Sequence, residues 1–129
     1  VQALVRRGFP AEQILVLHTS GGDAEKLIQA IQQRLGLGAA ADPKNQPPGE
    51  YVRVTTINAG TGLESPIVFL VGLKRLFEEE QSLRLSDTER EQVVRENTRK
   101  VYMAATRAGQ RLVFTYVGEL PQGLRAILS

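Results

Sequence analysis

One run of the sequence, "PIVFLVGL" at residues 66–73, constrains the fold more than any other. It is almost continuously apolar and rich in β-branched and aromatic side chains, with no charged residue to face solvent. A strand of this kind is typical of a parallel sheet that is covered on both faces. Three more segments have strand patterns, at residues 13–17, 51–57 and 111–117. The sequence therefore predicts a mainly parallel sheet with helices on both sides.

Helical patterns separate these strands, as the βαβ units of an α/β fold require, and the crossovers should be right-handed. One helix should start at Ser20, where Asp23 has capping-box spacing, and end at Gly36. The longest helix should start at Ser86, which has Glu89 three residues later. We expect the inward face of that helix to carry Val94, Val101, Tyr102 and Ala105. A short last helix is predicted within residues 120–129.

Composition limits the possible classes of protein. The 129 residues suit one domain, residues 1–129, and the net charge of +2 is too small to indicate nucleic-acid binding by itself. The chain has no cysteine and a single histidine, His18, so a metal site is not expected. No apolar run is long enough to span a membrane, and a cytoplasmic protein is the expectation. Because the chain begins at Val1 rather than Met, we expect a piece of a longer protein.

A loop with two glycines, Gly60 and Gly62, follows the second predicted strand and precedes Glu64. Glycines at the carboxyl end of a parallel strand let backbone N–H groups approach a phosphate, but they also serve ordinary tight connections. The loop alone does not decide between these interpretations. A full phosphate-binding P-loop needs a Gly-Lys pair, and the sequence contains none.

Arg107 follows the predicted long helix and precedes the last predicted strand, which leaves two interpretations of its guanidinium. It could satisfy carbonyl groups at the helix C-terminus, where a cation is favourable. Alternatively, the small side chains of Ala104 and Ala105 allow close packing that aims the guanidinium outward, toward a phosphate. Residue type by itself favours the first interpretation.

The glycine loop with the strand after it, and the helix end at Arg107, together resemble motifs V and VI of the UvrD/Rep-type superfamily 1 DNA helicases in order and spacing. The motif V matches are Thr56, Gly62, Leu63, Glu64, Val68, Phe69 and Gly72. The motif VI matches are Glu96, Arg99, Tyr102, Ala104, Thr106, Arg107, Ala108 and Leu112. With the upstream helix and strand pattern, the resemblance covers nearly the whole chain.

This resemblance implies the three-layer RecA-like second motor domain, called 2A, of an ATP-dependent helicase. ATP with Mg²⁺ would be held mainly by a preceding P-loop domain of the same protein, and this chain alone should not hydrolyse ATP. Arg107 would be an arginine finger, with Gly62 and Glu64 also at the ATP site and Glu64 near the ribose. Thr56 and Asn58 would contact single-stranded DNA, with RNA as the alternative strand.

The sequence departs from the family pattern in ways that bear on strand binding. Asn58 replaces the usual motif V histidine, and Thr61 replaces the lysine before Gly-Leu-Glu, so strand binding through this loop should be weaker. Residues 36–50 form a flexible connection where many relatives insert a 2B domain. The departures leave open a non-catalytic helicase-like scaffold or interaction domain. A free-standing nucleotide-binding protein is less expected, because no strand-glycine-helix phosphate turn is present.

Overall fold

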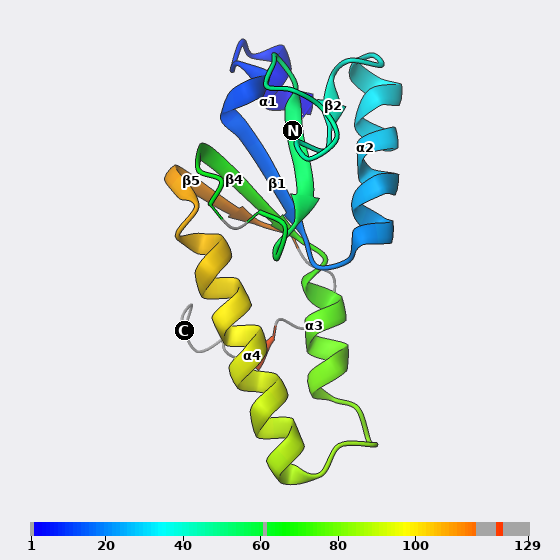
Figure 1. Cartoon of the computed structure of the whole chain (residues 1–129), viewed down its shortest axis with the longest axis vertical. Coiled ribbons are helices and arrows are strands. Elements are labelled where there is room, and N and C mark those ends of the chain that lie inside the picture. The colour runs from blue at the N-terminus through cyan, green and yellow to red at the C-terminus, as the bar shows by residue number, and fades with distance from the viewer. Residues whose placement is uncertain (1, 61, 116–120, 123–129) are drawn as a thin grey trace.

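The computed structural model describes residues 2–60, 62–115 and 121–122. Its sheet has five strands in the order β2-β3-β1-β4-β5, and every neighbouring pair is parallel (Figure 1). The strands are β1 (Ile14–His18), β2 (Ala40–Ala41), β3 (Val52–Thr56), β4 (Ser65–Val71) and β5 (Ala108–Phe114). The helices are α1 (Gln2–Arg6), α2 (Gly21–Leu35), α3 (Leu73–Glu80) and α4 (Asp87–Ala105), with a 3-10 turn, η1, at Ala11–Gln13. The predicted α/β class with a parallel sheet is confirmed.

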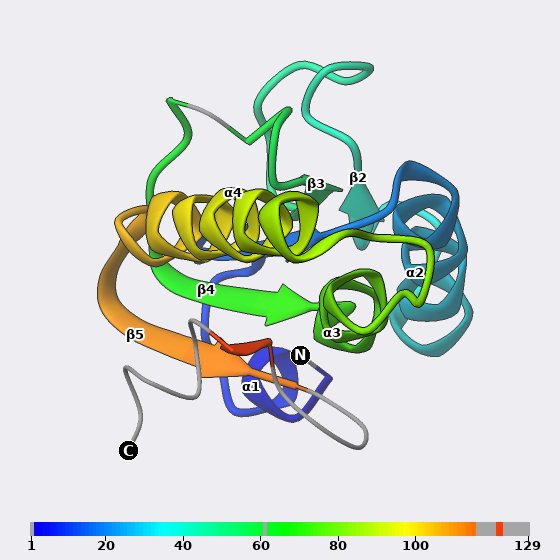
Figure 2. The same ribbon diagram turned by 90° about the horizontal axis from the view of Figure 1, so that it is seen from below.

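Two apolar clusters, one on each face of the sheet, hold the layers together. Leu15 and Leu17 of β1 pack with residues of α3 and α4, whereas Ile14 and Val16 pack with residues of α1 and α2. This alternation along one strand follows from the period of two in a β-strand. Figure 2 shows α4 on one side of β4 and β5 and α1 on the other. The central strands are therefore covered on both faces, as their apolar sequences predict.

The largest differences from the sequence prediction lie in β4, β5 and residues 36–50. Gly72 adopts φ 79° and ends β4, so Leu73 begins α3 instead of ending the strand. β5 starts at Ala108, earlier than the predicted residue 111, and residues 116–117 of that prediction lie outside the described residues. Residues 36–50 contain the edge strand β2, whose two alanines carry no strand signal in the sequence. The predicted last helix lies almost entirely outside the described residues.

The two predicted capping boxes had different outcomes. At Ser86, the Glu89 N–H donates to Ser86 Oγ (3.2 Å) and the Ser86 N–H donates to Glu89 Oε1 (3.0 Å), which confirms the box. Ser20 is the N-cap of α2, but its side chain makes no capping hydrogen bond, so the predicted box is wrong. The Ser20 N–H donates instead to His18 Nδ1 (2.9 Å), because the chain turns back at the end of β1.

The inward face of α4 is more polar than predicted. Asn97, Val101 and Ala104 are its buried residues, while Tyr102 is 66% exposed, so its predicted inward position is wrong. The polar Asn97 is buried because its amide donates to the Glu80 carboxylate (3.0 Å), which is itself buried. A fully buried carboxylate needs such a partner, and the N–H of Gln122 supplies a second one (2.8 Å).

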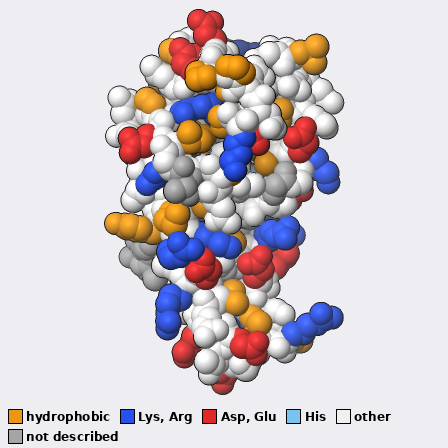
Figure 3. Space-filling view, viewed as in Figure 1, with side chains coloured by type: hydrophobic (Ala, Val, Ile, Leu, Met, Phe, Trp, Pro, Cys, Tyr) orange, Lys and Arg blue, Asp and Glu red, His pale blue; other side chains and the backbone are white. Residues whose placement is uncertain are grey.

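Charged side chains of both signs mix on the surface. In the view of Figure 3, Lys and Arg side chains lie interspersed with Asp and Glu. Among the described residues, none of the helices combines the length and the apolar character that crossing a membrane would need. This mixed surface agrees with the small net charge of +2.

Candidate functional site

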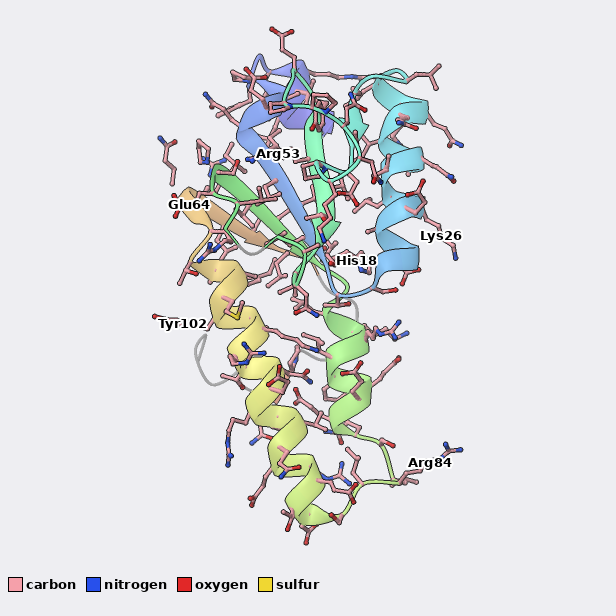
Figure 4. The ribbon with its side chains drawn as sticks, in the orientation of Figure 1. His18, Lys26, Arg53, Glu64, Arg84 and Tyr102 are labelled. Atoms are coloured by element: carbon pink, nitrogen blue, oxygen red, sulfur yellow. The ribbon has the colours of Figure 1, made fainter. Side chains whose placement is uncertain are left out.

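A cavity of about 430 Å³ lies at the amino ends of β4 and β5. Its walls are residues 64–66, at the start of β4, and residues 106–110, which follow α4 and include the first residues of β5. Glu64 and Arg107 therefore line one cavity, although 43 positions separate them in the sequence. Figure 4 shows Glu64 beside the end of α4, away from His18 at the carboxyl end of β1.

An irregularity in strand pairing shapes this cavity. Ser65 pairs with Ala108 and Ile67 pairs with Arg111, so β5 contains one more residue than β4 over this stretch. The odd residue lies opposite Pro66, which has no N–H to donate to the ladder. A bulge of this kind bends the strand locally, and bulges are common beside functional sites. The chain here departs from the regular sheet and leaves room for a ligand.

The backbone of Arg107 is fixed, but its guanidinium has few partners. Its N–H donates to the Ala104 carbonyl (3.1 Å), and its carbonyl accepts from the Ser65 N–H (3.0 Å). Nη2 donates to Thr106 Oγ1 (3.2 Å), while Nε is buried without a hydrogen-bond partner. Within residues 2–60, 62–115 and 121–122, no carboxylate forms an ion pair with Arg107. It is thus the backbone N–H of Arg107, and not its guanidinium, that binds a helix carbonyl.

Glu64 likewise has a main chain held by a hydrogen bond, and its side chain is exposed. Its carbonyl accepts a hydrogen bond from Arg53 Nη2 (3.0 Å). The next residue, Ser65, is buried and its hydroxyl donates to the Gln13 carbonyl just before β1. The carboxylate of Glu64 therefore stands at the cavity wall on a main chain that three segments anchor.

The remaining predicted site residues lie elsewhere. Thr56 ends β3 at the carboxyl edge of the sheet, and its hydroxyl accepts from the Ala59 N–H (3.1 Å). Asn58 is exposed in the turn that follows. Gly62 has φ 87° and is exposed, but it does not line the cavity of Glu64 and Arg107. Gly60 is the glycine that close packing requires, since a Cβ there would lie 2.6 Å from Leu17 Cδ2.

A second cavity, of about 410 Å³, lies at the carboxyl edge beside His18. Asp23 and Lys26 of α2 contribute to its wall. Burial lowers the pKa of His18; the Asp23 carboxylate opposes this shift and the Arg75 guanidinium adds to it. Because Nδ1 accepts from the Ser20 N–H, His18 holds the turn between β1 and α2. This contact gives His18 a structural role at the end of β1.

Sequence reasoning missed Arg53, the partner of the Glu64 carbonyl. It lies inside β3 between two buried valines, a pattern that indicates only an alternating strand. Nothing in the sequence signals that its side chain reaches a residue beyond the neighbouring strand. Only the strand order β3-β1-β4 brings the two residues within hydrogen-bonding distance.

Two comparisons with known proteins show the family of this chain. The family model of the UvrD-like helicase C-terminal domain matches residues 11–119. A curated relative, an ATP-dependent helicase/nuclease subunit from Lactobacillus helveticus (strain DPC 4571), is 31% identical over 100 residues. That match covers 57% of this chain and 8% of the relative's length. With both motifs inside the matched region, the chain belongs to the UvrD-like helicase C-terminal domain family.

Proposed function

We propose that this chain is the second motor domain of an ATP-dependent superfamily 1 helicase or translocase, and that Arg107 is its arginine finger. The observation that carries the proposal is the cavity that brings Glu64 and Arg107 together. Family membership supports it, and so does the guanidinium, whose Nε is buried without a hydrogen-bond partner and whose Nη2 donates to the neighbouring Thr106 hydroxyl. A buried N–H group without a partner, on a fixed backbone, can donate a hydrogen bond to an anionic ligand.

The chemistry assigned to Arg107 follows from its charge and shape. During phosphoryl transfer, negative charge spreads over the oxygens of the γ-phosphoryl group, and a planar guanidinium stabilises this charge with two hydrogen bonds. Arg107 can reach a phosphate without first breaking an ion pair, since none of the described carboxylates holds it. Its contribution therefore falls mainly on the rate of hydrolysis and less on the binding of ATP.

The cavity offers contacts for part of a nucleotide. Glu64 offers an acceptor for a ribose hydroxyl, and Gly62 allows the turn that precedes it. ATP with Mg²⁺ would be held mainly by a P-loop domain, since this sequence has no Gly-Lys pair. We therefore expect this chain alone not to hydrolyse ATP.

Single-stranded DNA would contact the other edge of the sheet, through Thr56 and Asn58. Both residues lie at the carboxyl end of β3, where polar groups can hydrogen-bond phosphate oxygens. Closure of two motor domains around ATP, and opening after hydrolysis, would move the strand in small steps.

The test is the Arg107→Ala variant of the complete protein. We expect its kcat for ATP hydrolysis to fall about a thousandfold, the low end for arginine fingers, with ATP affinity largely unchanged. Arg84→Ala is a matched control, because Arg84 is exposed in the loop between α3 and α4. Steady-state ATPase kinetics and nucleotide titration measure the two quantities. An unchanged kcat in Arg107→Ala would refute the assignment.

A second candidate function is a non-catalytic helicase-like scaffold. The replacement of the motif V histidine and lysine by Asn58 and Thr61 favours it, because both changes weaken contact with a nucleic-acid strand. The two candidates differ in the wild-type complete protein. Strand-stimulated ATP hydrolysis supports the motor, whereas its absence in a folded preparation supports the scaffold.

A further inference from the structure

Arg53 lies on the face of the sheet that also carries the end of α4. Its neighbours Val52 and Val54 pack in the cluster of α1 and α2, so alternation places Arg53 on the opposite face. Its partner in β1, Leu15, belongs to the cluster that includes Val101 of α4. Arg53 therefore lies on the face of the sheet that α4 covers, and Arg107 follows the C-terminal end of that helix.

The side chain of Arg53 spans a strand to make its contact. β1 lies between β3 and β4, and Arg53 Nη2 reaches beyond it to the carbonyl of Glu64 (3.0 Å). Arg53 Nε is buried without a hydrogen-bond partner, and no described carboxylate forms an ion pair with Arg53. The Glu64 carbonyl is thus the contact that fixes the position of this guanidinium.

The main chain around Glu64 is held from both sides. On one side Arg53 binds its carbonyl, and on the other the N–H of Ser65 binds the carbonyl of Arg107 (3.0 Å). Without Arg53, the Glu64–Ser65 peptide would keep the hydrogen bond of its N–H but lose the one at its carbonyl, and the nearest bond before it would be that of the Leu63 N–H to the Gly60 carbonyl (3.0 Å). The Glu64 carboxylate, which is exposed, depends on this peptide for its place at the cavity wall.

We infer that Arg53 is a positioning residue, which holds the Glu64 main chain so that the Glu64 carboxylate meets the nucleotide ribose. This inference rests on the proposed function, in which Glu64 contacts the nucleotide. A fixed hydrogen bond from a charged donor is strong enough for this role. Misplacement of a contacting group by a fraction of an ångström to an ångström weakens its interaction with a ligand.

The experiment is a double-mutant cycle in the complete protein with Arg53→Gln, Glu64→Ala and both changes. KM and kcat are measured for ATP and for 3′-deoxy-ATP, which lacks a ribose hydroxyl. We expect Arg53→Gln to raise KM for ATP about fivefold to tenfold with little change in kcat. The preference for ATP over 3′-deoxy-ATP should fall as well. In the Glu64→Ala background, Arg53→Gln should have no further effect on either quantity.

Several outcomes would overturn the inference. An Arg53→Gln variant with wild-type KM, or one that raises KM equally in both backgrounds, would show that Arg53 does not act through Glu64. If Glu64→Ala itself leaves KM and ribose preference unchanged, the proposed role of Glu64 fails and the inference falls with it. If Glu64→Ala has an effect but Arg53→Gln has none, the inference alone fails.

Two further variants separate positioning from charge and from folding. Arg53→Lys keeps the charge and most of the stem, and therefore the fold, but ends one bond short of Nη2. The increase in log KM for ATP in Arg53→Lys should be at least half of the increase in Arg53→Gln. A wild-type KM in Arg53→Lys would overturn the inference. Arg84→Gln, at the exposed loop between α3 and α4, is the matched arginine control.

Discussion

Gly72 shows how a single residue sets a boundary in this fold. Its φ of 79° is left-handed, and a Cβ there would lie 2.5 Å from His18 Cε1 and 2.6 Å from Thr19 Oγ1. Gly72→Ala should therefore combine a backbone penalty of about 1–2 kcal/mol with overpacking of about 1–3 kcal/mol. We expect a total loss of roughly 3 kcal/mol in the free energy of unfolding. Urea denaturation of the chain measures this quantity.

Gly8 provides the control for the backbone part of that penalty. It has φ 92° but no atom within 4 Å of a Cβ built at its position. Gly8→Ala should therefore lose only about 1–2 kcal/mol, from the left-handed backbone alone. Equal losses in the two variants would show that the contacts of Gly72 with His18 and Thr19 can relax without cost.

At the scale of residues, the sequence singles out Arg107 as a candidate site residue but gives no such signal for Arg53. Arg107 has a family motif around it, and it lies between a helical pattern and an apolar strand pattern. Arg53 has only an alternating strand around it, and its contact with Glu64 depends on strand order. Single residues that act across a neighbouring strand are therefore invisible to sequence patterns.

At the scale of elements, the N-termini of α2 and α4 offer a direct comparison. Ser86 accepts a hydrogen bond from the Glu89 N–H, while the Ser20 side chain makes no capping bond. Ser86→Ala should cost about 1 kcal/mol of stability, whereas Ser20→Ala should cost only a few tenths. In urea denaturation, the midpoint should shift clearly in Ser86→Ala and only slightly in Ser20→Ala.

Similar losses in both serine variants would contradict this assignment of the caps. The sequence could not distinguish the two helices, since each has a serine with an acidic residue three positions later. The difference arises from the preceding strand. His18 at the end of β1 takes the Ser20 N–H, the group that Asp23 would need in a capping box.

The other strands and helices could be predicted where the sequence has a clear apolar pattern. The four longer strands have apolar runs and were found, but β2 has only two alanines and is defined by its pairing with β3. α3 begins directly after Gly72, which has a left-handed backbone conformation. The sequence does not indicate this conformation, because the apolar run continues to Leu73. Tertiary pairing, rather than local preference, decides such short elements.

At the scale of the whole molecule, the predicted site residues divide between two edges of the sheet. Glu64 and Arg107 lie at the amino ends of β4 and β5, whereas Thr56 and Asn58 lie at the carboxyl end of β3. Residues 57–64 join these edges, and those of them that the structure describes form no helix. Gly60 lets this connection pack against Leu17. In the proposed function, this short connection would link the nucleotide contact to the strand contact.

This division predicts that the two proposed interactions can be separated by mutation. In the complete protein, Asn58→Ala should weaken binding of a fluorescent oligothymidylate about fivefold, the loss of one hydrogen bond. Asn45→Ala, in the exposed part of residues 36–50, is the matched control and should leave this affinity unchanged. Arg107→Ala should also bind the oligonucleotide normally when no nucleotide is added, because its cavity opens at the other edge. Weaker oligonucleotide binding in Arg107→Ala but not in Asn58→Ala would place the strand at the cavity, and the assignment of the two edges would have to be exchanged.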